Sequence, residues 1–377
     1  MTDSKIESQV HNNISVAVDV GTTTIGVSCV DVDLKSVITE FSFSNPQKIY
    51  GADVITRIKH CIDSPSVEKS MSDMLLMKLN EELQNALSDN YDRIGCLCYS
   101  GNTTMLHILR KLSVEGLAAA PFKPVTLDYF ECNVTHDDSG EESDRIKEYF
   151  IPGFSAFVGA DILSGVEYLN MGKNEKYDLL IDLGTNGEML LINNKCGFAT
   201  STACGPVFDH GVTGAVYGSE CIKAIATCIK RGLIDDTGLI KEPFFEKGLN
   251  ISDDVVITQE QLRRFQMAKA AIYAGVICLM SKADIGYDDI DNVYISGGLG
   301  FYLNIRDAYI VKMLPDRFKD KIKVFGNTSL EGAKRFLLHE NRNDLLVEYE
   351  KIRNRTESFE LANYKDFQEI YISSMNF

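Results

Sequence analysis

The sequence has no long hydrophobic run and no excess of basic residues, and both absences restrict the partners of the protein. No apolar stretch reaches the roughly 18 residues that a membrane-spanning helix needs, and the first 15 residues are polar. The 377 residues include 38 lysines and arginines against 54 aspartates and glutamates, a net charge of −16. Such a charge disfavours nucleic acid and anionic lipid. We therefore expect a cytoplasmic protein that binds neither nucleic acid nor a membrane.

The ten cysteines also lack the spacing that an iron–sulfur cluster requires. Neither a C-x₄-C-x₂-C nor a C-x₂-C-x₂-C pattern occurs among them. Without a secretion signal, a disulfide framework is not expected either. Cys96 and Cys98 lie two residues apart in a strand-like run, so both thiols share one face and are predicted to be small core side chains. The sequence thus predicts no iron–sulfur cluster in this chain.

Two similar segments, 16–26 and 179–190, carry the most informative motif that is present. Each is an apolar run that ends in Asp-x-Gly-Thr and returns as a second apolar run, which is typical of a β-hairpin with a glycine turn. Glycine lets the backbone approach an anion, nearby hydroxyls and amides donate hydrogen bonds, and the aspartate can hold a hydrated Mg²⁺. One such turn is more often an ordinary hairpin. Two of them, in the order and spacing of duplicated ATPase halves, predict a phosphate clamp.

The remaining periodicities indicate a mixed α/β protein. Apolar residues at helical spacing predict an amphipathic helix over 70–88, and the run 94–99 predicts a buried strand. A long helix is predicted over 259–283. The strand that starts at residue 292 ends in glycines, where a nucleoside can lie against bare backbone. The charged stretch 135–145 is predicted to be a solvated loop.

Strands that alternate with helices divide the chain into two similar regions and a tail. The first region covers 14–170 and closes with a helix that leads directly into the second hairpin. The second region covers 176–340 and repeats the plan of hairpin followed by helices. The tail, 341–377, is charged and then ends in apolar residues, which we expect to pack back on the first region or on a partner.

The two hairpins and the later glycines resemble the ATPase superfamily of actin, sugar kinases and heat-shock chaperones. Over residues 16–340 the chain more specifically resembles the ATPase portion of the reductive activators of corrinoid proteins. The segments that carry this resemblance are NPQ…GADVITRI (45–58), GNTTMLH (101–107), PGFSAFVGADILSG (152–165), IDLGTNGEM (181–189), ACGPVFDHG (203–211), QMAKAAIYAG (266–275), ISGGLG (295–300) and GNTSLEGAKRFL (326–337). The resemblance implies an α/β fold of two actin-like (ribonuclease-H-like) ATPase lobes with a nucleotide cleft between them.

The same resemblance implies an ATP hydrolase (ATPase) that couples hydrolysis to reduction of a Co(II) corrinoid to Co(I). It implies ATP and Mg²⁺ as cofactors, a corrinoid protein as partner and a homodimer as the assembly. Members of the family typically carry an iron–sulfur domain, whereas only about 13 residues precede the first strand here. We therefore expect a separate low-potential donor, such as a ferredoxin or flavoprotein, to supply the electron. The alternative is that the ATPase remodels a corrinoid partner.

The resemblance also implies roles for individual residues. Asp19 and Asp182 would hold Mg²⁺ through water. Asp161 and Glu188 are candidates for orienting the attacking water, or else serve structure or metal hydration. Cys204 is expected to be a buried small side chain rather than a redox thiol. The residues implied to bind the nucleotide are Gly21, Thr22, Thr23, Gly184, Thr185, Asn186, Gly205, Gly297, Gly298 and Gly300.

Two other functions stay open at this point. One is the activator ATPase of a 2-hydroxyacyl-CoA dehydratase, a dimer with a cluster that bridges its subunits; iron analysis after anaerobic purification would identify it. The other is a nucleotide-dependent assembly or sensor protein without net redox chemistry. Measuring ATP turnover with and without a corrinoid protein would identify that one.

Overall fold

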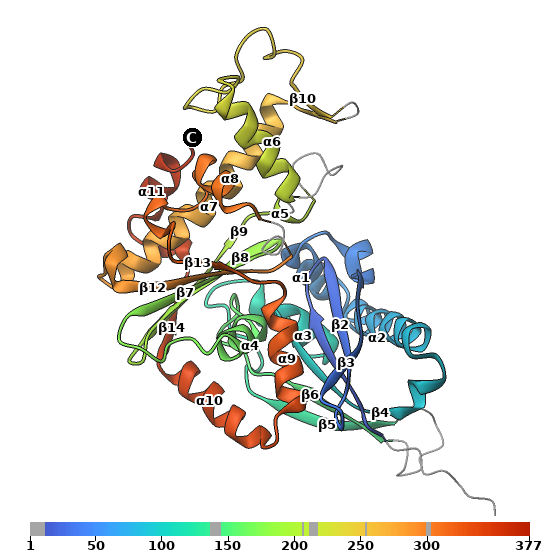
Figure 1. The fold of residues 1–377 in the computed structure, drawn as a ribbon. Helices are drawn as coiled ribbons and strands as arrows, with labels where there is room; N and C mark the ends of the chain where they lie inside the picture. The colour runs from blue at the N-terminus through green and yellow to red at the C-terminus, as the bar shows by residue number, and fades with distance from the viewer. Residues whose placement is uncertain (1–11, 136–144, 206, 211–217, 253–254, 299–302) are drawn as a thin grey trace, which may run out of the picture. The chain divides into compact units, whose positions relative to one another are not determined.

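The chain forms two compact units, each built around a six-stranded mixed sheet (Figure 1). The computed structural model describes residues 12–135, 145–205, 207–210, 218–252, 255–298 and 303–377. Unit 1 comprises residues 1–152 and 330–346, and unit 2 comprises 153–329 and 347–377. The predicted α/β class is confirmed. In the part of the chain that the structure describes, every helix is too short or too polar to cross a lipid bilayer.

The sheet of unit 1 has the strand order β3-β2-β1-β4-β6-β5. Its strands are β1 (Ile14–Val20), β2 (Thr24–Asp31), β3 (Ser36–Ser44), β4 (Ile94–Gly101), β5 (Phe130–Thr135) and β6 (Arg145–Phe150). β1 pairs antiparallel with β2 and parallel with β4. Both β1 and β2 are buried almost throughout, because helices and loops cover the two faces of the sheet centre. The first predicted hairpin is therefore the middle of this sheet.

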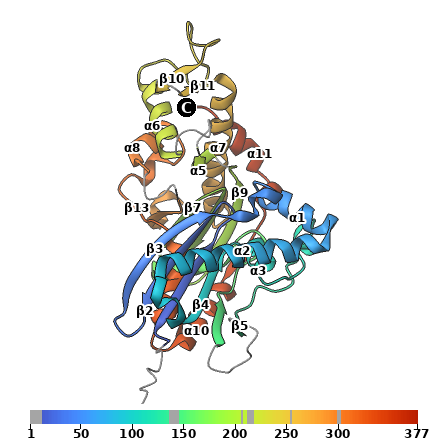
Figure 2. The same ribbon diagram turned by 90° about the vertical axis from the view of Figure 1, so that its right-hand side faces the viewer.

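Helices of unit 1 cover the sheet through an apolar stripe. They are α1 (Val54–Asp63), α2 (Pro65–Leu87) and α3 (Thr103–Leu109), and Figure 2 shows α2 lying across the sheet with α3 beside it. The helix predicted over 70–88 is α2, and it begins earlier because Pro65 can occupy its first turn. The stripe is confirmed, since Leu75, Leu79 and Leu83 are each at most 3% exposed.

The sheet of unit 2 repeats this plan with the order β13-β12-β7-β8-β9-β14. Its strands are β7 (Tyr177–Leu183), β8 (Asn186–Ile192), β9 (Gly197–Ala203), β12 (Ile290–Ser296), β13 (Ile322–Val324) and β14 (Thr356–Ser358). β7 pairs antiparallel with β8 and parallel with β12, just as β1 pairs with β2 and β4. The duplication predicted from the two hairpins thus extends to five strands of each sheet, whereas the sixth strand, β5 or β14, is added at opposite edges.

The two faces of β7 pack against different parts of unit 2. Its helices are α4 (Ala160–Tyr168), α5 (Val207–His210), α6 (Gly218–Lys230), α7 (Gln259–Lys282), α8 (Ile305–Ile310) and α11 (Phe367–Ser373), and a small hairpin joins β10 (Leu249–Ser252) to β11 (Val255–Ile257). Leu179 and Ile181 lie in one core with Ile225 of α6 and Ile272 of α7. Leu180 points to the other face. There, a Cβ placed on Gly165 of α4 would lie 3.6 Å from Leu180 Cδ2.

The division into units differs from the predicted regions at two places. Residues 153–170 belong to unit 2 because α4 packs on β7, and residues 330–346 belong to unit 1. Two helices, α9 (Thr328–Leu338) and α10 (Arg342–Asn354), each begin in one unit and end in the other. Within unit 1, Phe336 contacts Tyr149 edge-on at 5.6 Å, and Lys334 forms an ion pair with Glu40 at 3.0 Å. These contacts link distant segments, which local patterns do not reveal.

Most of the tail packs on unit 2 and not on the first region. β14 adds to the edge of the second sheet by pairing parallel with β9. Phe377 is 4% exposed, and its ring lies 6.3 Å from that of Phe265 in α7. Lys269 of α7 is fully buried and donates hydrogen bonds of 2.6 Å to the carbonyl oxygens of Ser374 and Asn376. The segment QMAKAAIYAG therefore holds the tail.

This buried lysine makes the stability of the protein depend on pH. Burial lowers the pKa of Lys269 from 10.5 to about 7, and Lys312 acts in the same direction. Between these pH values the unfolded chain binds the proton and the folded chain does not, so the free energy of unfolding should rise with pH from about 7 towards 10. The slope is at most about 1.4 kcal/mol per pH unit. Urea unfolding at pH 6, 8 and 9.5 would measure it.

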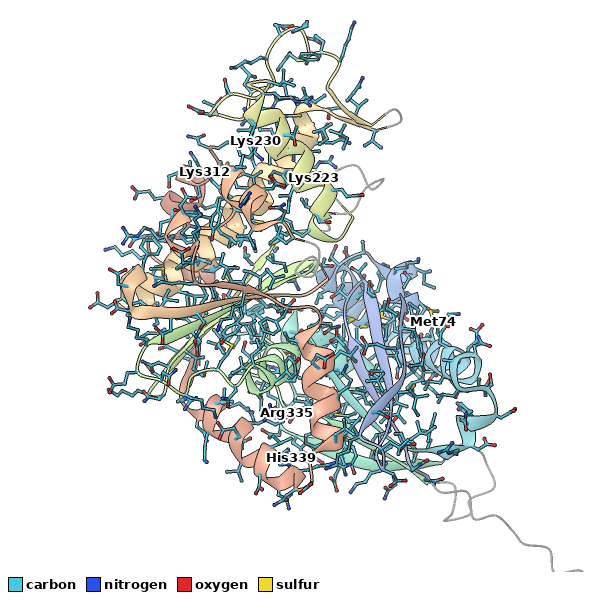
Figure 3. The ribbon with its side chains drawn as sticks, viewed as in Figure 1. Met74, Lys223, Lys230, Lys312, Arg335 and His339 are labelled. Atoms are coloured by element: carbon cyan, nitrogen blue, oxygen red, sulfur yellow. The ribbon has the colours of Figure 1, made fainter. Side chains whose placement is uncertain are left out.

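Lys269→Met should remove this rise, although it also leaves two carbonyl oxygens without their donor. Lys223→Met is the matched control, because Lys223 is an exposed lysine on α6 (Figure 3). The control should keep the slope of the wild-type protein. Equal slopes for Lys269→Met and the wild-type protein would show that Lys269 keeps its ordinary pKa when folded.

Candidate functional site

In unit 1 the predicted phosphate turn, residues 21–23, has all its carbonyl groups held by neighbouring residues. The carbonyl of Gly21 accepts from Asn45 Nδ2 at 2.9 Å, and that of Thr22 accepts from Arg57 Nη2 at 2.7 Å. The carbonyl of Thr23 accepts from the backbone N–H of Asn45 at 2.8 Å. Because a trans peptide is planar, each carbonyl directs the following N–H to the opposite side. Successive N–H groups on one side of a turn form an anion-binding concavity.

The end of β4 fixes the same turn from another direction. Asn102 caps α3 by accepting from the backbone N–H of Met105 at 3.0 Å, and its Nδ2 donates to Thr22 Oγ1 at 3.0 Å. Thr22 is 6% exposed, and its hydroxyl is engaged in this hydrogen bond. Gly101 has φ of +147°, and a Cβ there would lie 2.5 Å from the carbonyl oxygen of Val20. The segment GNTTMLH thus supports the turn.

In unit 2 the turn between β7 and β8 lies beside a fixed carboxylate. The backbone N–H of Gly184 donates to the carbonyl oxygen of Asn186 at 3.1 Å, which closes the turn around Thr185. Asp182 Oδ2 accepts from Ser296 Oγ of β12 at 2.6 Å. A Cβ on Gly297, where φ is +90°, would lie 2.8 Å from Asp182 Oδ1. Only a residue without a side chain fits against this carboxylate.

The two half-sites share a feature that the sequence did not reveal to us. Asp19 is paired in register with Ser100 of the parallel strand β4, and Asp182 is paired in register with Ser296 of the parallel strand β12. In both units a glycine with positive φ follows the serine. A Ser-Gly pair at the end of a predicted strand is the signal that would have found this repeat. Asp19 and Asp182 therefore occupy equivalent places in two copies of one structure.

Two acidic side chains face each other across the second hairpin. Asp182 and Glu188 are directly opposite in the antiparallel register of β7 and β8, so their side chains share one face with Cβ atoms about 4.5 to 5.5 Å apart. Glu188 is 7% exposed. Like charges at this separation repel, and a bound cation relieves the repulsion. Carboxylates suit Mg²⁺, so these residues fit the implied metal.

The third acidic candidate, Asp161, lies in the first turn of α4 on the same face of the sheet. The chain that follows α4 returns to the start of β7, where the backbone N–H of Gly172 donates to the carboxylate of Asp178 at 2.9 Å. The helix therefore runs antiparallel to the strand. Gly165 is level with Leu180. One helical turn back to Asp161 is about 6 Å, and two strand residues forward to Asp182 are about 7 Å. The fold therefore brings Asp161 and Asp182 towards the same end of β7.

No group of three or more His, Cys, Asp or Glu side chains in the described ranges could hold a metal directly. Mg²⁺ usually keeps several of its water ligands when a protein binds it, which fits the prediction that Asp19 and Asp182 hold it through water. Asp19 belongs to unit 1 and Asp182 to unit 2. That both aspartates act on one Mg²⁺ stays a prediction.

The other predicted residues are placed as follows. Gly205 has φ of +65°, and no atom lies within 4 Å of a Cβ built on it, so it follows β9 with open space around it. Gly298 is exposed in the turn after β12, and Gly300 lies outside the described residues. Cys204 is 5% exposed, as expected of a small buried side chain. The outer part of the charged stretch, residues 136–144, also lies outside the described residues.

Comparisons with known proteins show which family this chain resembles. A family model described as the RACo middle region matches residues 14–174, and one described as the C-terminal domain of RACo, the ASKHA domain, matches residues 209–377. The corrinoid activation enzyme RamQ of Eubacterium limosum is 26% identical over 96% of this chain and 70% of its own length. The [Co(II) methylated amine-specific corrinoid protein] reductase of Methanosarcina barkeri is 22% identical over 96% of this chain and 76% of its own length.

A solved structure, the reductive activator for a corrinoid, iron–sulfur protein, superposes with a TM-score of 0.85 at 28% identity and covers 98% of this chain. The present chain spans 66% of the length of that protein, just under two thirds. The two family models together cover most of the chain, from the first hairpin to the tail. The chain belongs to the RACo family of reductive activators of corrinoid proteins.

Proposed function

We propose that this chain is an ATPase that drives the reduction of a corrinoid protein from Co(II) to Co(I). The observation that carries the proposal is the repeated half-site: an anion-binding turn, an aspartate, and a Ser-Gly pair in the neighbouring parallel strand, once in each unit. Duplicated half-sites of this kind suit a nucleotide with several phosphates and a metal ion. The names of the two relatives supply the corrinoid partner.

The residues of the half-sites would divide the work. The outward N–H groups of the turn 21–23 bind phosphate oxygens, and Gly297 and Gly298 let the nucleoside approach the backbone after β12. Asp19 and Asp182 would hold Mg²⁺ through its water ligands, and Asp161 or Glu188 would orient the attacking water. When bound, Mg²⁺ would neutralise the charge that develops on the phosphates.

Electron transfer needs a second protein in this scheme. One electron passes from a separate low-potential donor, such as a ferredoxin, to Co(II), which becomes Co(I). Hydrolysis of ATP to ADP and phosphate supplies the free energy that makes this transfer favourable. It does so by changing the relative stability of two conformations of the complex. We further propose that the activator works as a homodimer.

An absorption assay for Co(I) tests the function. The purified chain, a Co(II) corrinoid protein and a low-potential reductant should form Co(I) when Mg²⁺ and ATP are added, and should fail with a non-hydrolysable analogue. Because linkage is reciprocal, the corrinoid protein should also change the affinity for that analogue by about 5- to 150-fold without any reductant. Two results together would favour a nucleotide-dependent sensor as the function. Co(I) would form equally well without ATP, and the corrinoid protein would change neither the affinity for the ATP analogue nor the rate of ATP turnover.

A further inference from the structure

Unit 1 buries one arginine directly behind the phosphate turn. Arg57, in the first turns of α1, has no exposed surface. Its Nη2 donates to the carbonyl oxygen of Thr22 at 2.7 Å, and its Nε donates to that of Gly51 at 3.0 Å. Nη1 lies 3.2 Å from Met105 Sδ and 3.4 Å from Gln47 Oε1. The guanidinium is therefore held in one orientation by two turns of backbone and two side chains.

The charge of this arginine is not balanced by an ion pair in the described part of the chain. Its acceptors are two carbonyl oxygens, an amide oxygen and a thioether sulfur. Asp53 acts on it only at a distance, because its carboxylate caps α1 by accepting from the backbone N–H and hydroxyl of Thr56. Burial lowers the pKa of Arg57 to about 10, so the group still carries its charge at neutral pH.

A buried cation without a carboxylate partner is costly to a fold. An arginine with only a structural role would be expected to have an acidic residue beside it, as Arg93 at the other end of this sheet has in Asp31. Arg57 instead donates to the carbonyl oxygen of Thr22, and because a trans peptide is planar, the next N–H lies on the side opposite to Arg57. The cation and this peptide dipole therefore act in the same direction. Both favour negative charge on the far side of the turn.

We propose that Arg57 is a positioning residue for the phosphates of the bound nucleotide. It fixes the carbonyl of Thr22, which sets the outward N–H groups, and it adds a positive charge that water does not screen. The inference deepens the proposed function and depends on it, since it assumes that this turn binds phosphate. It goes further by naming a residue that acts on the phosphates through the backbone of the turn and does not touch them.

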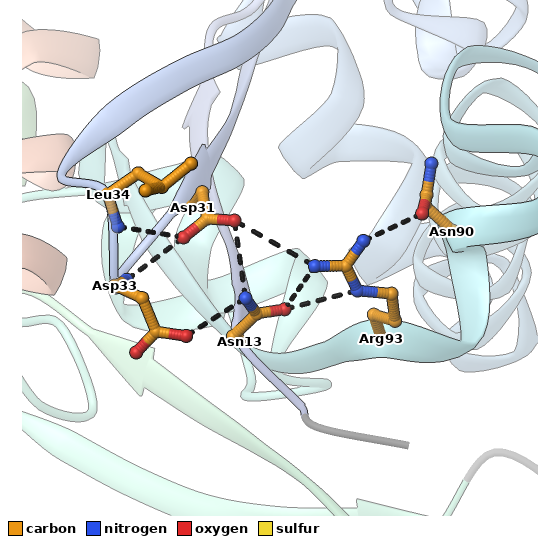
Figure 4. Close-up of polar contacts among 6 residues, drawn as sticks. All are labelled: Asn13, Asp31, Asp33, Leu34, Asn90 and Arg93. Atoms are coloured by element: carbon orange, nitrogen blue, oxygen red, sulfur yellow. Dashed lines mark hydrogen bonds and ion pairs between the residues drawn. The ribbon is translucent and has the colours of Figure 1, made fainter. Parts of the chain in front are cut away.

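Arg93 provides a matched control in the same unit. It lies at the opposite end of β1 from the turn, where it donates to Asn13 Oδ1 at 2.8 Å and to Asn90 Oδ1 at 2.8 Å (Figure 4). It also forms an ion pair with Asp31 at 3.8 Å. β1 is seven residues long, so its two ends lie about 20 Å apart. Removing Arg93 therefore removes an arginine beside this sheet without touching the turn.

Calorimetry with AMP-PNP and Mg²⁺, and separately with adenosine, tests the proposal on the full chain. Arg57→Met should bind AMP-PNP about 10- to 100-fold more weakly, as when the outer partner of a ligand group is removed. Adenosine lacks phosphates, so its affinity should change less than about 2-fold. Arg57→Lys keeps the charge but not the fork that spans both carbonyls, and should lose about 5-fold for AMP-PNP only. Arg93→Met should bind both ligands normally.

Salt dependence separates a role in charge from a role in shape alone. The affinity of wild-type protein and Arg57→Lys for AMP-PNP should fall as salt rises from 50 to 500 mM, and Arg57→Met should show a shallower fall. An unchanged affinity of Arg57→Met for AMP-PNP would overturn the inference, as would equal losses for AMP-PNP and adenosine. If Arg57→Met does not fold, Arg57→Lys decides by the same comparison. If the wild-type protein itself binds no AMP-PNP, the proposed function fails together with this inference.

Discussion

Asp182→Asn should lower the rate of ATP hydrolysis by about 100- to 1,000-fold. The substitution removes the negative charge that would hold hydrated Mg²⁺ beside the second turn. It keeps the shape of the side chain, and the amide oxygen can still accept the hydrogen bond from Ser296 Oγ. The fold should therefore survive, and phosphate release at saturating ATP and Mg²⁺ would measure the loss.

Asp178→Asn is the control for this prediction, because Asp178 lies four residues earlier on the same face of β7. Its carboxylate accepts from the backbone N–H of Gly172 and from Asn292 Nδ2, so the residue serves the packing of unit 2. We expect Asp178→Asn to lower the melting temperature and to leave turnover within a few-fold of wild type. Asp19→Asn in unit 1 should repeat the effect of Asp182→Asn. Turnover close to wild type in both site variants would remove the phosphate clamp from consideration.

Gly297→Ala should destabilise the protein by about 3 kcal/mol or more and abolish ATP hydrolysis. At this position φ is +90°, which disfavours any side chain, and the added Cβ would lie 2.6 Å from the carbonyl oxygen of Leu183 and 2.8 Å from Asp182 Oδ1. The carbonyl oxygen belongs to the backbone of β7, and the Asp182 carboxylate is held through its other oxygen by Ser296 Oγ, so neither atom can move away cheaply. Urea unfolding and phosphate release would measure the two losses.

Gly232→Ala separates the effect of the clash from that of backbone conformation. Gly232 has φ of +70°, and no atom lies within 4 Å of a Cβ built on it. Its substitution should cost only the left-handed conformation, about 1 to 2 kcal/mol, and leave hydrolysis unchanged. If Gly232→Ala and Gly297→Ala cost the same, the close approach of β12 to Asp182 is not what requires glycine at 297.

The parts of the structure that the sequence predicted are those that neighbouring residues determine. Each hairpin is a continuous segment, and the leucines of α2 recur every four residues, so pattern alone located them. The turn that leads from the strand at 94–99 into the next helix was also predicted, because strand, turn and helix follow one another directly in the sequence. Local patterns such as these need no knowledge of the rest of the chain.

The parts that were missed depend on residues far apart in the sequence. The two strands on either side of the charged stretch, β5 and β6, pair with each other across residues that read as a loop. The pairing of Ser296 with Asp182 joins residues of two separate strands, and the contact of Arg57 with Thr22 joins a helix to a turn. Hydrophobic periodicity carries no information on such pairs. The resemblance marked the segments that contain them, but not what each residue contacts.

The interleaving of the two units has a consequence for the time at which the protein can finish folding. The chain leaves unit 1 at residue 152 and supplies the rest of that unit only at 330–346. At about 5 to 20 residues per second, a ribosome takes roughly 10 to 35 s to make the intervening part. Throughout that interval Tyr149 lacks its contact with Phe336, because Phe336 has not yet been synthesised. The nascent first sheet would therefore expose apolar surface while unit 2 is being made, and a chaperone that binds such surface would raise the yield of folded protein.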